Sequence, residues 1–318
     1  MKVLAIVGPT AVGKSALAVE IAKHCNGEII STDSMQIYIG MNIGTATPTE
    51  TERDGVAHHL VDVWTPSHDV SVAEFQQVAR LAIDELISRG AQPIVVGGSG
   101  LYVAGVLDDL KFPGTDPQVR AVIEAELLEK GAAHLHARLV SVDPVAAAAI
   151  LPTNGRRIVR ALEVIELTGE PFTATLPPPV SVYPAIRIGL EIPRSVLDER
   201  IAERVHLMWA AGFVDEVREL AADGLANWRT ASRALGYLQV LAYLNGDCSS
   251  EQALQATIDA TSKFARRQQR WFRRDSRITW IDYDAPDAIP RVLAALGSET
   301  LCSTRCLVRV RLVARGCG

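Results

Sequence analysis

The first residues able to do chemistry form a glycine-rich turn near the start of the chain. Residues 8–15 read Gly-Pro-Thr-Ala-Val-Gly-Lys-Ser and match G-x-x-x-x-G-K-[ST] at every fixed position. The turn follows an apolar run and precedes an amphipathic stretch, which is the setting of a phosphate-binding loop. Its backbone N–H groups would point at a phosphate, Lys14 would add positive charge, and the Ser15 hydroxyl would hold Mg²⁺. The predicted phosphate site therefore consists of Gly8, Pro9, Thr10, Ala11, Val12, Gly13, Lys14 and Ser15.

The glycine-rich turn does not identify the phosphorylated compound. ATP is the usual ligand, and many enzymes that cleave it pair the turn with an apolar strand ending in a Walker-B aspartate. The corresponding run at 93–98 reads Pro-Ile-Val-Val-Gly-Gly and carries no carboxylate. This is consistent with a bound diphosphate whose terminal phosphate is not transferred.

An acidic side chain follows the second apolar run. Asp33 comes directly after Ile-Ile-Ser-Thr at 29–32, at the strand end where ligands of open α/β sheets bind. It fits a general base or an oriented hydrogen-bond acceptor, and equally the structural cap of a turn. Residues 43–48 and 58–62 are predicted to be polar loops, and paired histidines at 58–59 favour a structural role over metal binding.

These groups must be positioned by the elements that alternate along the chain. Short β-branched runs predict strands at 3–7, 28–31, 93–96, 186–192 and 278–281. Apolar residues three and four positions apart predict helices at 15–25, 72–89, 198–222 and 251–274. This alternation predicts an α/β fold, a P-loop NTPase-like parallel sheet with helices on both faces.

The middle of the chain departs from this alternation. Residues 116–168 have a helical pattern without a strand, between a Phe-Pro-Gly turn and three consecutive prolines. We predict a helical insertion domain at 115–183 and a core domain formed by 1–114 and 184–300. The tail at 301–318, with four arginines and no acid, is assigned no fold.

Composition restricts the class of protein. The chain has 318 residues, 48% hydrophobic and 22% charged, as in an ordinary globular protein. Its longest purely apolar stretch, 145–151, is far below the ~20 residues that cross a bilayer, and the opening run is too short for a signal peptide. The five thinly spread cysteines fit a reducing cytoplasm, and Cys302 and Cys306 lack the second close pair of a zinc site. We expect a cytoplasmic protein with no membrane partner.

Positive charge is concentrated in one segment although the net charge is −5. Residues 263–277 contain seven lysines and arginines against one acid. Helical spacing places four arginines on one face beside two aromatic side chains, namely Arg266, Arg270, Arg273, Arg277, Trp271 and Phe272. Such a stripe is typical of RNA phosphate binding, and the alternative is a solvated basic helix without a ligand. A second basic cluster in the predicted insertion consists of Arg156, Arg157 and Arg160.

Together these motifs resemble those of the bacterial tRNA dimethylallyltransferases, also called tRNA isopentenyltransferases. The resemblance covers residues 1–285 and departs at Ile39, where the family usually has a basic residue. Besides the glycine-rich turn, it rests on Asp-Ser-Met-Gln-Ile-Tyr at 33–38, Asn-Ile-Gly-Thr-Ala at 42–46, His-His-Leu-Val-Asp at 58–62, Gly-Gly-Ser-Gly-Leu-Tyr at 97–102, residues 157–163, Arg-Ala-Leu-Gly-Tyr at 233–237 and Arg-Arg-Gln at 266–268.

The resemblance implies a reaction and a role for several residues. The glycine-rich turn would hold dimethylallyl diphosphate with Mg²⁺. The acceptor would be N6 of adenosine 37, next to the anticodon of tRNAs that read UNN codons, and the products would be i6A37 and diphosphate. Asp33 would engage N6, Thr10 would steady the leaving oxygen, and Arg233 and Lys14 would bind the diphosphate.

The resemblance also implies an interface with the anticodon stem-loop of tRNA, and we expect the protein to act as a monomer. The residues predicted to contact tRNA are Asp33, Ser34, Met35, Gln36, Ser99, Arg120, Arg157, Ile158, Val159, Arg160, Ala161, Arg266, Arg267 and Arg270.

Three alternatives explain parts of the sequence. A P-loop small-molecule kinase would use the glycine-rich turn but not the basic stripe. An adenylate dimethylallyltransferase acting on free nucleotides would share the chemistry and would also not need that stripe. A non-catalytic RNA-binding P-loop protein would not need both Lys14 and Asp33.

Overall fold

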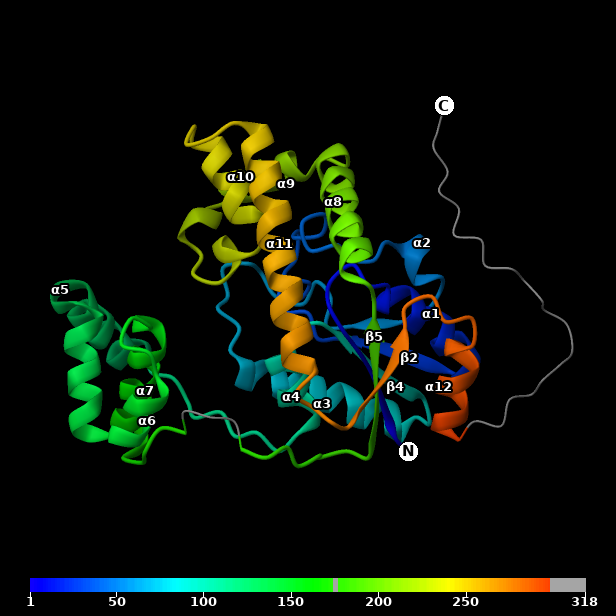
Figure 1. Ribbon diagram of the computed structural model, residues 1–318, viewed down its shortest axis with the longest axis horizontal. Helices are drawn as coiled ribbons and strands as arrows, with labels where there is room; N and C mark the ends of the chain where they lie inside the picture. Colours follow the sequence, from blue (N-terminus) through cyan, green and yellow to red (C-terminus); the bar gives the residue numbers. More distant parts are fainter. Residues whose placement is uncertain (174–176, 298–318) are drawn as a thin grey trace, which may run out of the picture.

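A six-stranded parallel sheet forms the centre of the structure. The computed structural model describes residues 1–173 and 177–297 (Figure 1), so the tail, with Cys302 and Cys306, lies outside the described residues. The strand order is β3-β2-β4-β1-β5-β6. The strands are β1 Val3–Val7, β2 Gly27–Ser31, β3 His58–His59, β4 Gln92–Gly97, β5 Ala185–Glu191 and β6 Ile278–Asp282. The predicted α/β class is confirmed.

Helices cover both faces of this sheet, so every residue of the central strand β1 is buried. Leu4 and Ile6 pack in one cluster with α1 (Lys14–Cys25) and α12 (Ala288–Leu296). Val3, Ala5 and Val7 point to the other face, where they join a cluster with α3 (Val72–Ser88) and α4 (Gly100–Leu107). A strand buried on both faces is a continuous apolar run, which is why the sequence predicted β1 correctly.

The shortest strand was not predicted. Residues 58–62 were expected to be a polar loop, but His58 and His59 pair with Ile29 and Ile30 as the edge strand β3. The prediction is wrong at these two positions because two polar residues at an edge show no apolar alternation. His59 is structural, since its Nε2 lies 2.7 Å from Oε2 of Glu28 on β2.

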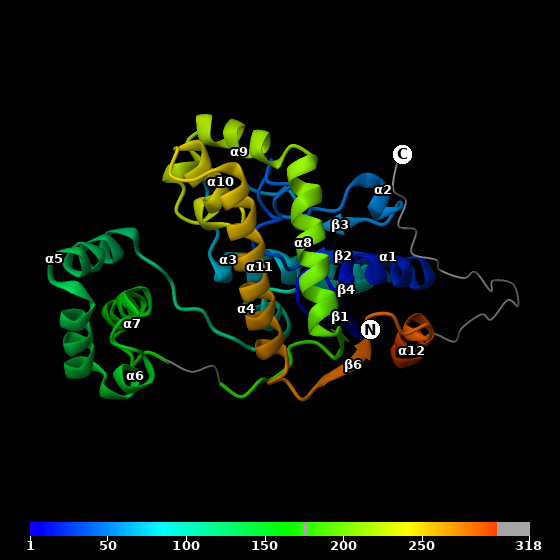
Figure 2. The same ribbon diagram turned by 45° about the horizontal axis from the view of Figure 1, so that its top comes forward.

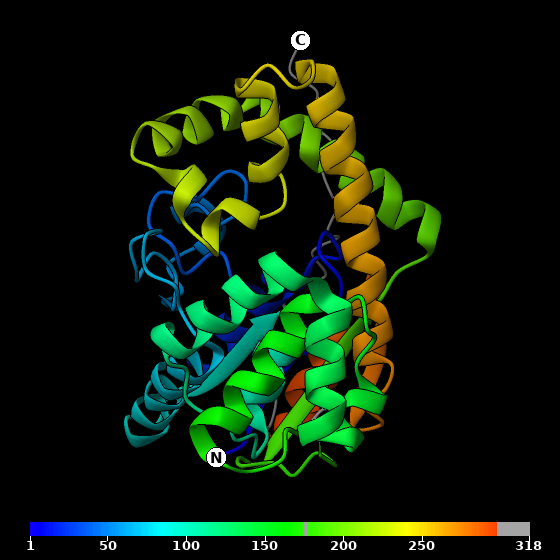
Figure 3. The same cartoon turned by 90° about the vertical axis from the view of Figure 1, so that its left-hand side faces the viewer.

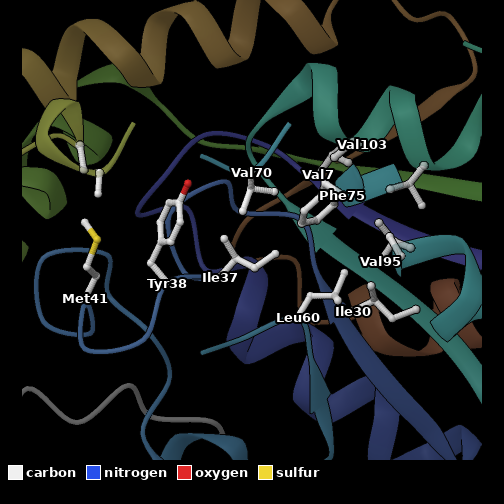
Figure 4. Close-up of a cluster of buried hydrophobic side chains, with 14 of the residues drawn as sticks. Val7, Ile30, Ile37, Tyr38, Met41, Leu60, Val70, Phe75, Val95 and Val103 are labelled. Carbon is white, nitrogen blue, oxygen red and sulfur yellow. The ribbon is translucent and has the colours of Figure 1, made fainter. Parts of the chain in front are cut away.

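The loop after β2 is held by the core, although it has little regular structure. Ile37, Tyr38 and Met41 are fully buried. They join the same cluster as Val70 and Phe75, next to the α3 face of the sheet (Figure 4). Burial of three large side chains fixes the path of the chain beyond Asp33, because leaving the core would expose them to water.

A group of helices lies at the carboxyl ends of the strands, and the last of them runs back alongside α4 (Figures 1 and 2). Its elements are α8 Arg194–Ala210, α9 Phe213–Ala222, η1 Leu225–Asn227, η2 Ala231–Arg233, α10 Tyr237–Leu244 and α11 Ser250–Phe272. The sequence predicted one helix over 198–222, but the chain turns at Gly212, whose φ of 95° is left-handed. Helical spacing of apolar residues on both sides of this glycine concealed the break. The short helix α2, Glu50–Arg53, lies next to β3 (Figure 2).

Residues 117–168, which follow α4 and precede β5, form a separate group of helices, drawn at the left of Figure 1 and in front in Figure 3. These are α5 (Pro117–Val142), α6 (Pro144–Ala149) and α7 (Gly155–Thr168). They share a core of their own, which includes Ile123, Leu135, Leu139, Ile158 and Leu162. The chain leaves and returns at one place, because Leu107 and Asp109 bond through their backbones to Val182 and Val180.

Candidate active site

The glycine-rich turn connects β1 to α1 and is held from two directions. The Thr10 backbone N–H donates to Oε1 of Gln268 on α11 at 2.8 Å. The Lys14 ammonium donates to the Pro9 carbonyl at 2.7 Å, so its charge lies over the turn. Ser15 is exposed in the first turn of α1. The structure therefore places Thr10, Lys14 and Ser15 together at the positive end of a helix, where an anion is stabilised.

An arginine that the sequence did not single out completes the positive charge around this turn. Nη1 of Arg204, on α8, lies 3.5 Å from the Thr10 hydroxyl. A second arginine of the same helix, Arg200, lies 3.5 Å from the Val12 carbonyl through its own Nη1. Both belong to a stretch predicted only as an amphipathic helix, where one arginine looks like any other solvated residue. Only the packing of α8 over the turn identifies them.

The positive charges of Lys14 and Arg204 favour the binding of an anion at the turn. The pKa of Lys14 is lowered to about 7, chiefly by burial and then by the positive charge of Arg204, while the negative charge of Asp33 partly opposes both effects. Burial also lowers the pKa of Arg204. Lys14 and Arg204 repel each other, although Asp33 attracts the first and Glu52 the second, and an incoming diphosphate would relieve that repulsion.

Asp33 occupies the end of β2 as predicted. Its Oδ1 accepts the backbone N–H of Met35 at 2.9 Å, so it caps the turn that follows. Burial raises its pKa, whereas the N–H of Met35 and the charge of Lys14 lower it. Both roles considered for Asp33 are therefore compatible, because a carboxylate that caps a turn can still take a proton from a neighbouring ligand.

The glycine run after β4 passes directly beside α11. A Cβ atom at position 98 would lie 2.2 Å from Nε2 of Gln268, so a larger residue there would displace that side chain. Gln268 is 5% exposed and contacts the phosphate turn with its other amide atom. Ser99 is the residue before α4 and is half-buried. Gln268 thus joins the turn to the glycine run, a role that its place in the Arg-Arg-Gln motif did not reveal.

Arg233 is not part of this cluster of contacts. It is exposed at the end of η2, and its side chain makes no hydrogen bond or ion pair with the part of the chain that the structure describes. Arg204 instead provides the arginine beside Thr10. The diphosphate-binding role of Arg233 stays a prediction.

Comparison with known proteins identifies the family. The family model described as IPP transferase matches residues 36–275. The chain is 60% identical to a tRNA dimethylallyltransferase of Thermobifida fusca, over 92% of this chain and 93% of the relative. The chain belongs to the IPP transferase family. Membership confirms the resemblance inferred from the motifs and favours prenyl transfer over the kinase interpretation.

Solved structures of IPP transferases agree with the fold. A full-length tRNA isopentenylpyrophosphate transferase from Bacillus halodurans is 42% identical, with a TM-score of 0.70, over 93% of this chain and 95% of that chain. A eukaryotic dimethylallyltransferase described as acting on tRNA is 25% identical, with a TM-score of 0.75, over 93% of this chain and 78% of that chain. The described residues include no helix long and apolar enough to cross a membrane.

The basic stripe of this IPP transferase is only partly as predicted. Arg266, Arg267 and Arg270 are exposed on α11. Together with α8, this helix lines a groove of about 740 Å³ formed by Arg194, Arg266, Gln269, Arg270, Arg273 and Arg274. Arg194 was not predicted, because it is remote in sequence and only the packing of α8 on α11 brings it near.

Three residues expected on the stripe lie elsewhere. The helix ends at Phe272, so Arg277 leaves the predicted face and pairs with Asp108 and Asp275, each at 2.7 Å. Phe272 is 3% exposed within the core, and Trp271 packs against the same core cluster. The prediction for these three residues is wrong, because the spacing argument assumed a longer helix and solvent-facing aromatic rings.

The tRNA contacts predicted in the helical group fall into two kinds. The side chains of Ile158, Val159 and Ala161 are buried in the core of α5–α7, so they face neighbouring helices. Arg120 and Arg160 both bind Glu163, which is fully buried. Arg157, in the first turn of α7, is exposed. RNA contact at these positions stays a prediction.

The residues after Asp33 are placed close to the site. Ser34, Met35 and Gln36 are half-buried, and Met35 packs against the main core cluster. Gln36 Oε1 accepts a hydrogen bond from the Ser31 hydroxyl at 2.9 Å, so this side chain is already bonded within the protein. Their contact with tRNA is likewise a prediction.

Proposed function

We propose that the chain transfers the dimethylallyl group of dimethylallyl diphosphate to N6 of adenosine 37 in tRNAs that read UNN codons, giving i6A37 and diphosphate. The observation that carries the proposal is one site in which Lys14, Arg204 and Asp33 meet beside the glycine-rich turn. The family and its tRNA-modifying relatives support it. A tRNA acceptor implies a cytoplasmic enzyme, and we take a single chain as the catalytic unit.

Positive groups at the turn would stabilise the leaving diphosphate. When the bond between C1 of the dimethylallyl group and oxygen breaks, its electron pair stays on the diphosphate. Lys14, Arg204 and the backbone N–H groups of the turn are then in place to stabilise the growing negative charge, and the Thr10 hydroxyl is available to the leaving oxygen. The C5 group acquires allylic cation character and becomes open to attack.

Asp33 would engage the acceptor. The nitrogen lone pair of N6 forms the new bond to C1, and N6 releases one proton, which the Asp33 carboxylate accepts. The adenine must leave the anticodon loop to reach this site, and unpaired loop bases are cheaper to extrude than paired ones. The raised pKa of Asp33 suits this role, because a more basic carboxylate accepts a proton more readily.

Mg²⁺ fits the residues that are present. The described residues contain no group of three or more histidine, cysteine or acidic side chains that could hold a metal alone. Mg²⁺ does not require one, because it commonly binds one or two protein oxygens together with substrate phosphates and water. The exposed Ser15 hydroxyl in the first turn of α1 is such an oxygen. A bound Mg²⁺ would neutralise part of the diphosphate charge.

Mass analysis of nucleosides from tRNA treated with the purified protein, dimethylallyl diphosphate and Mg²⁺ tests this function. The expected product is i6A at position 37, and a point change of that adenosine should abolish it. Prenylation of free AMP in place of tRNA would indicate the adenylate enzyme instead. Loss of the outermost phosphate of ATP to a small molecule would indicate a kinase.

The pH dependence of the reaction should report Lys14. Its pKa is lowered to about 7, so the cation is present below that pH and is lost as pH rises through it. The kcat/KM for dimethylallyl diphosphate should therefore fall above about pH 7. Bound diphosphate stabilises the ammonium, so the fall in kcat should occur at higher pH than the fall in kcat/KM. An alkaline limb at the same pH in both profiles would contradict this assignment.

The exposed arginines of α11 should govern the salt dependence of tRNA binding. Changing Arg266 and Arg270 together to alanine should weaken binding and lower the slope of log Kd against log salt by about 1 to 2, since each phosphate contact releases roughly one counterion. The slope is measured by titrating labelled tRNA at several salt concentrations. Arg218→Ala, which removes an exposed arginine paired with Asp215, is the matched control. An unchanged slope in the double variant would place the RNA elsewhere.

A further inference from the structure

A single carboxylate on α9 accepts four hydrogen bonds. Oε2 of Glu216 accepts the backbone N–H of Asn42 at 3.0 Å and that of Ile43 at 2.7 Å, and Oε1 accepts the N–H of Gly44 at 3.2 Å. The buried Tyr237 hydroxyl donates to Oε1 at 2.6 Å. Three consecutive N–H groups that converge on one anion form a nest, and here the protein provides the anion itself.

The turn that carries these N–H groups lies directly against the helices. A Cβ atom at position 44 would lie 2.2 Å from Cε2 of Phe213 and 2.5 Å from Cε2 of Tyr237, so no larger residue fits without displacing a ring. The two rings pack edge to face, with centroids 5.0 Å apart. The turn is therefore held both by the charge of Glu216 and by close packing against two aromatic rings. This packing explains why glycine stands at position 44 of the Asn-Ile-Gly-Thr-Ala motif.

Gln36 binds the carbonyl groups at the end of the same turn. Nε2 of Gln36 donates to the carbonyls of Thr45 and Ala46, both at 3.2 Å. Its Oε1 accepts the Ser31 hydroxyl, and the oxygen of that hydroxyl accepts the Asp33 backbone N–H at 3.3 Å. A continuous path of hydrogen bonds and covalent chain thus runs from Glu216 to the backbone of Asp33.

We propose that Glu216 is a positioning residue for prenyl transfer: it fixes the turn of residues 42–46, and through that turn it holds Gln36 and the loop that carries Asp33. This rests on the proposed function. Glu216 lies 174 positions from Asn42 in the sequence, so only the fold brings the two residues together. Small displacements of a reacting group cost much rate, so a carboxylate that holds this loop in place contributes to the rate.

Glu216→Gln is the sharpest variant, because it keeps the size of the side chain. One oxygen can still accept, but the new NH₂ group faces N–H donors and leaves them unpaired. We expect kcat to fall about 10- to 100-fold, as for loss of a charge-assisted bond, while KM for dimethylallyl diphosphate changes less than about threefold. Asp215→Asn is the matched control, since this neighbouring acid is exposed and pairs only with Arg218 among the described residues.

A double-mutant cycle separates positioning from general loss of stability. If Glu216 acts through Gln36, Glu216→Gln should change kcat less than about threefold in a Gln36→Ala background, because the path is already broken. Thermal unfolding of each variant shows how much folded protein is assayed. Independent, multiplying effects of the two substitutions, or an unchanged kcat in Glu216→Gln, would overturn the proposal while wild-type transfer still upheld the function.

If Glu216→Gln does not fold, Tyr237→Phe decides the question. It removes only the hydroxyl donor and leaves the three backbone bonds in place. The carboxylate is then held less firmly, so kcat should fall by roughly threefold to tenfold with KM for the diphosphate unchanged. An unchanged kcat in folded Tyr237→Phe would overturn the positioning role. An inactive wild-type protein would instead refute the proposed function.

Discussion

Asp33→Asn is expected to lower kcat for dimethylallyl transfer about 10²- to 10⁴-fold, the range that a positioned general base contributes. The substitution is informative because an asparagine oxygen can still accept the Met35 N–H that Asp33 accepts now. The turn is thus preserved while the proton acceptor is lost. Transfer is measured with labelled dimethylallyl diphosphate at saturating tRNA.

Binding measurements decide whether Asp33 acts in chemistry or in folding. The Kd for tRNA should change less than about threefold, since phosphate contacts dominate affinity for nucleic acids. Asp54→Asn is the matched control, because Asp54 is an exposed acid whose partner is Lys23. Full transfer by Asp33→Asn would remove the carboxylate from the mechanism, and a large loss of tRNA binding would assign it to RNA recognition instead.

Lys14→Ala and Arg204→Ala are each expected to lower kcat/KM for dimethylallyl diphosphate about 10²- to 10³-fold, the usual effect of removing a preorganised group that stabilises transition-state charge. The structure places both cations at the glycine-rich turn, where Asp33 is the carboxylate that raises the pKa of Lys14. Steady-state kinetics with varied dimethylallyl diphosphate measure the loss, and tRNA affinity should be preserved.

The two cations should also interact with each other. Arg204 lowers the pKa of Lys14, so its removal should raise that pKa and move the alkaline limb of the kcat/KM profile to higher pH. Lys23→Ala, on the same helix as Lys14 but exposed and paired with Glu20 and Asp54, is the control. Wild-type kinetics in Arg204→Ala would show that another residue, with Arg233 the first to test, binds the diphosphate.

The charges in the free site favour one order of substrate binding. Lys14 and Arg204 lie close together beside the Asp33 carboxylate, so the free enzyme carries repulsion between the two cations that the diphosphate relieves on binding. The same carboxylate must become the base for the incoming amine. Diphosphate binding should therefore precede or accompany productive entry of the adenine, since without that anion the Lys14 charge acts directly on Asp33.

The local parts of this site could be predicted from the order of residues alone. The glycine-rich turn, the apolar run of β1 and the carboxylate after β2 are each encoded within a few consecutive residues, where spacing and residue type restrict the backbone. The core sheet was predictable for the same reason, because strands buried on both faces are continuous apolar runs. The two-residue edge strand β3 carries no such signal and was missed.

The distant side chains that complete the site are selected by how the helices pack. Arg204 and Gln268 reach Thr10 from 194 and 258 positions away, and Glu216 reaches Asn42 from 174. On their own helices these residues look like ordinary polar positions, because helical spacing specifies a face but not the element that covers it. Arg277 was predicted on the basic stripe but does not lie there. Because α11 ends at Phe272, Arg277 leaves the face of the helix and forms an ion pair with buried Asp108. Packing between helices that are far apart in the chain determines which side chains join the site, and no local sequence pattern contains that information.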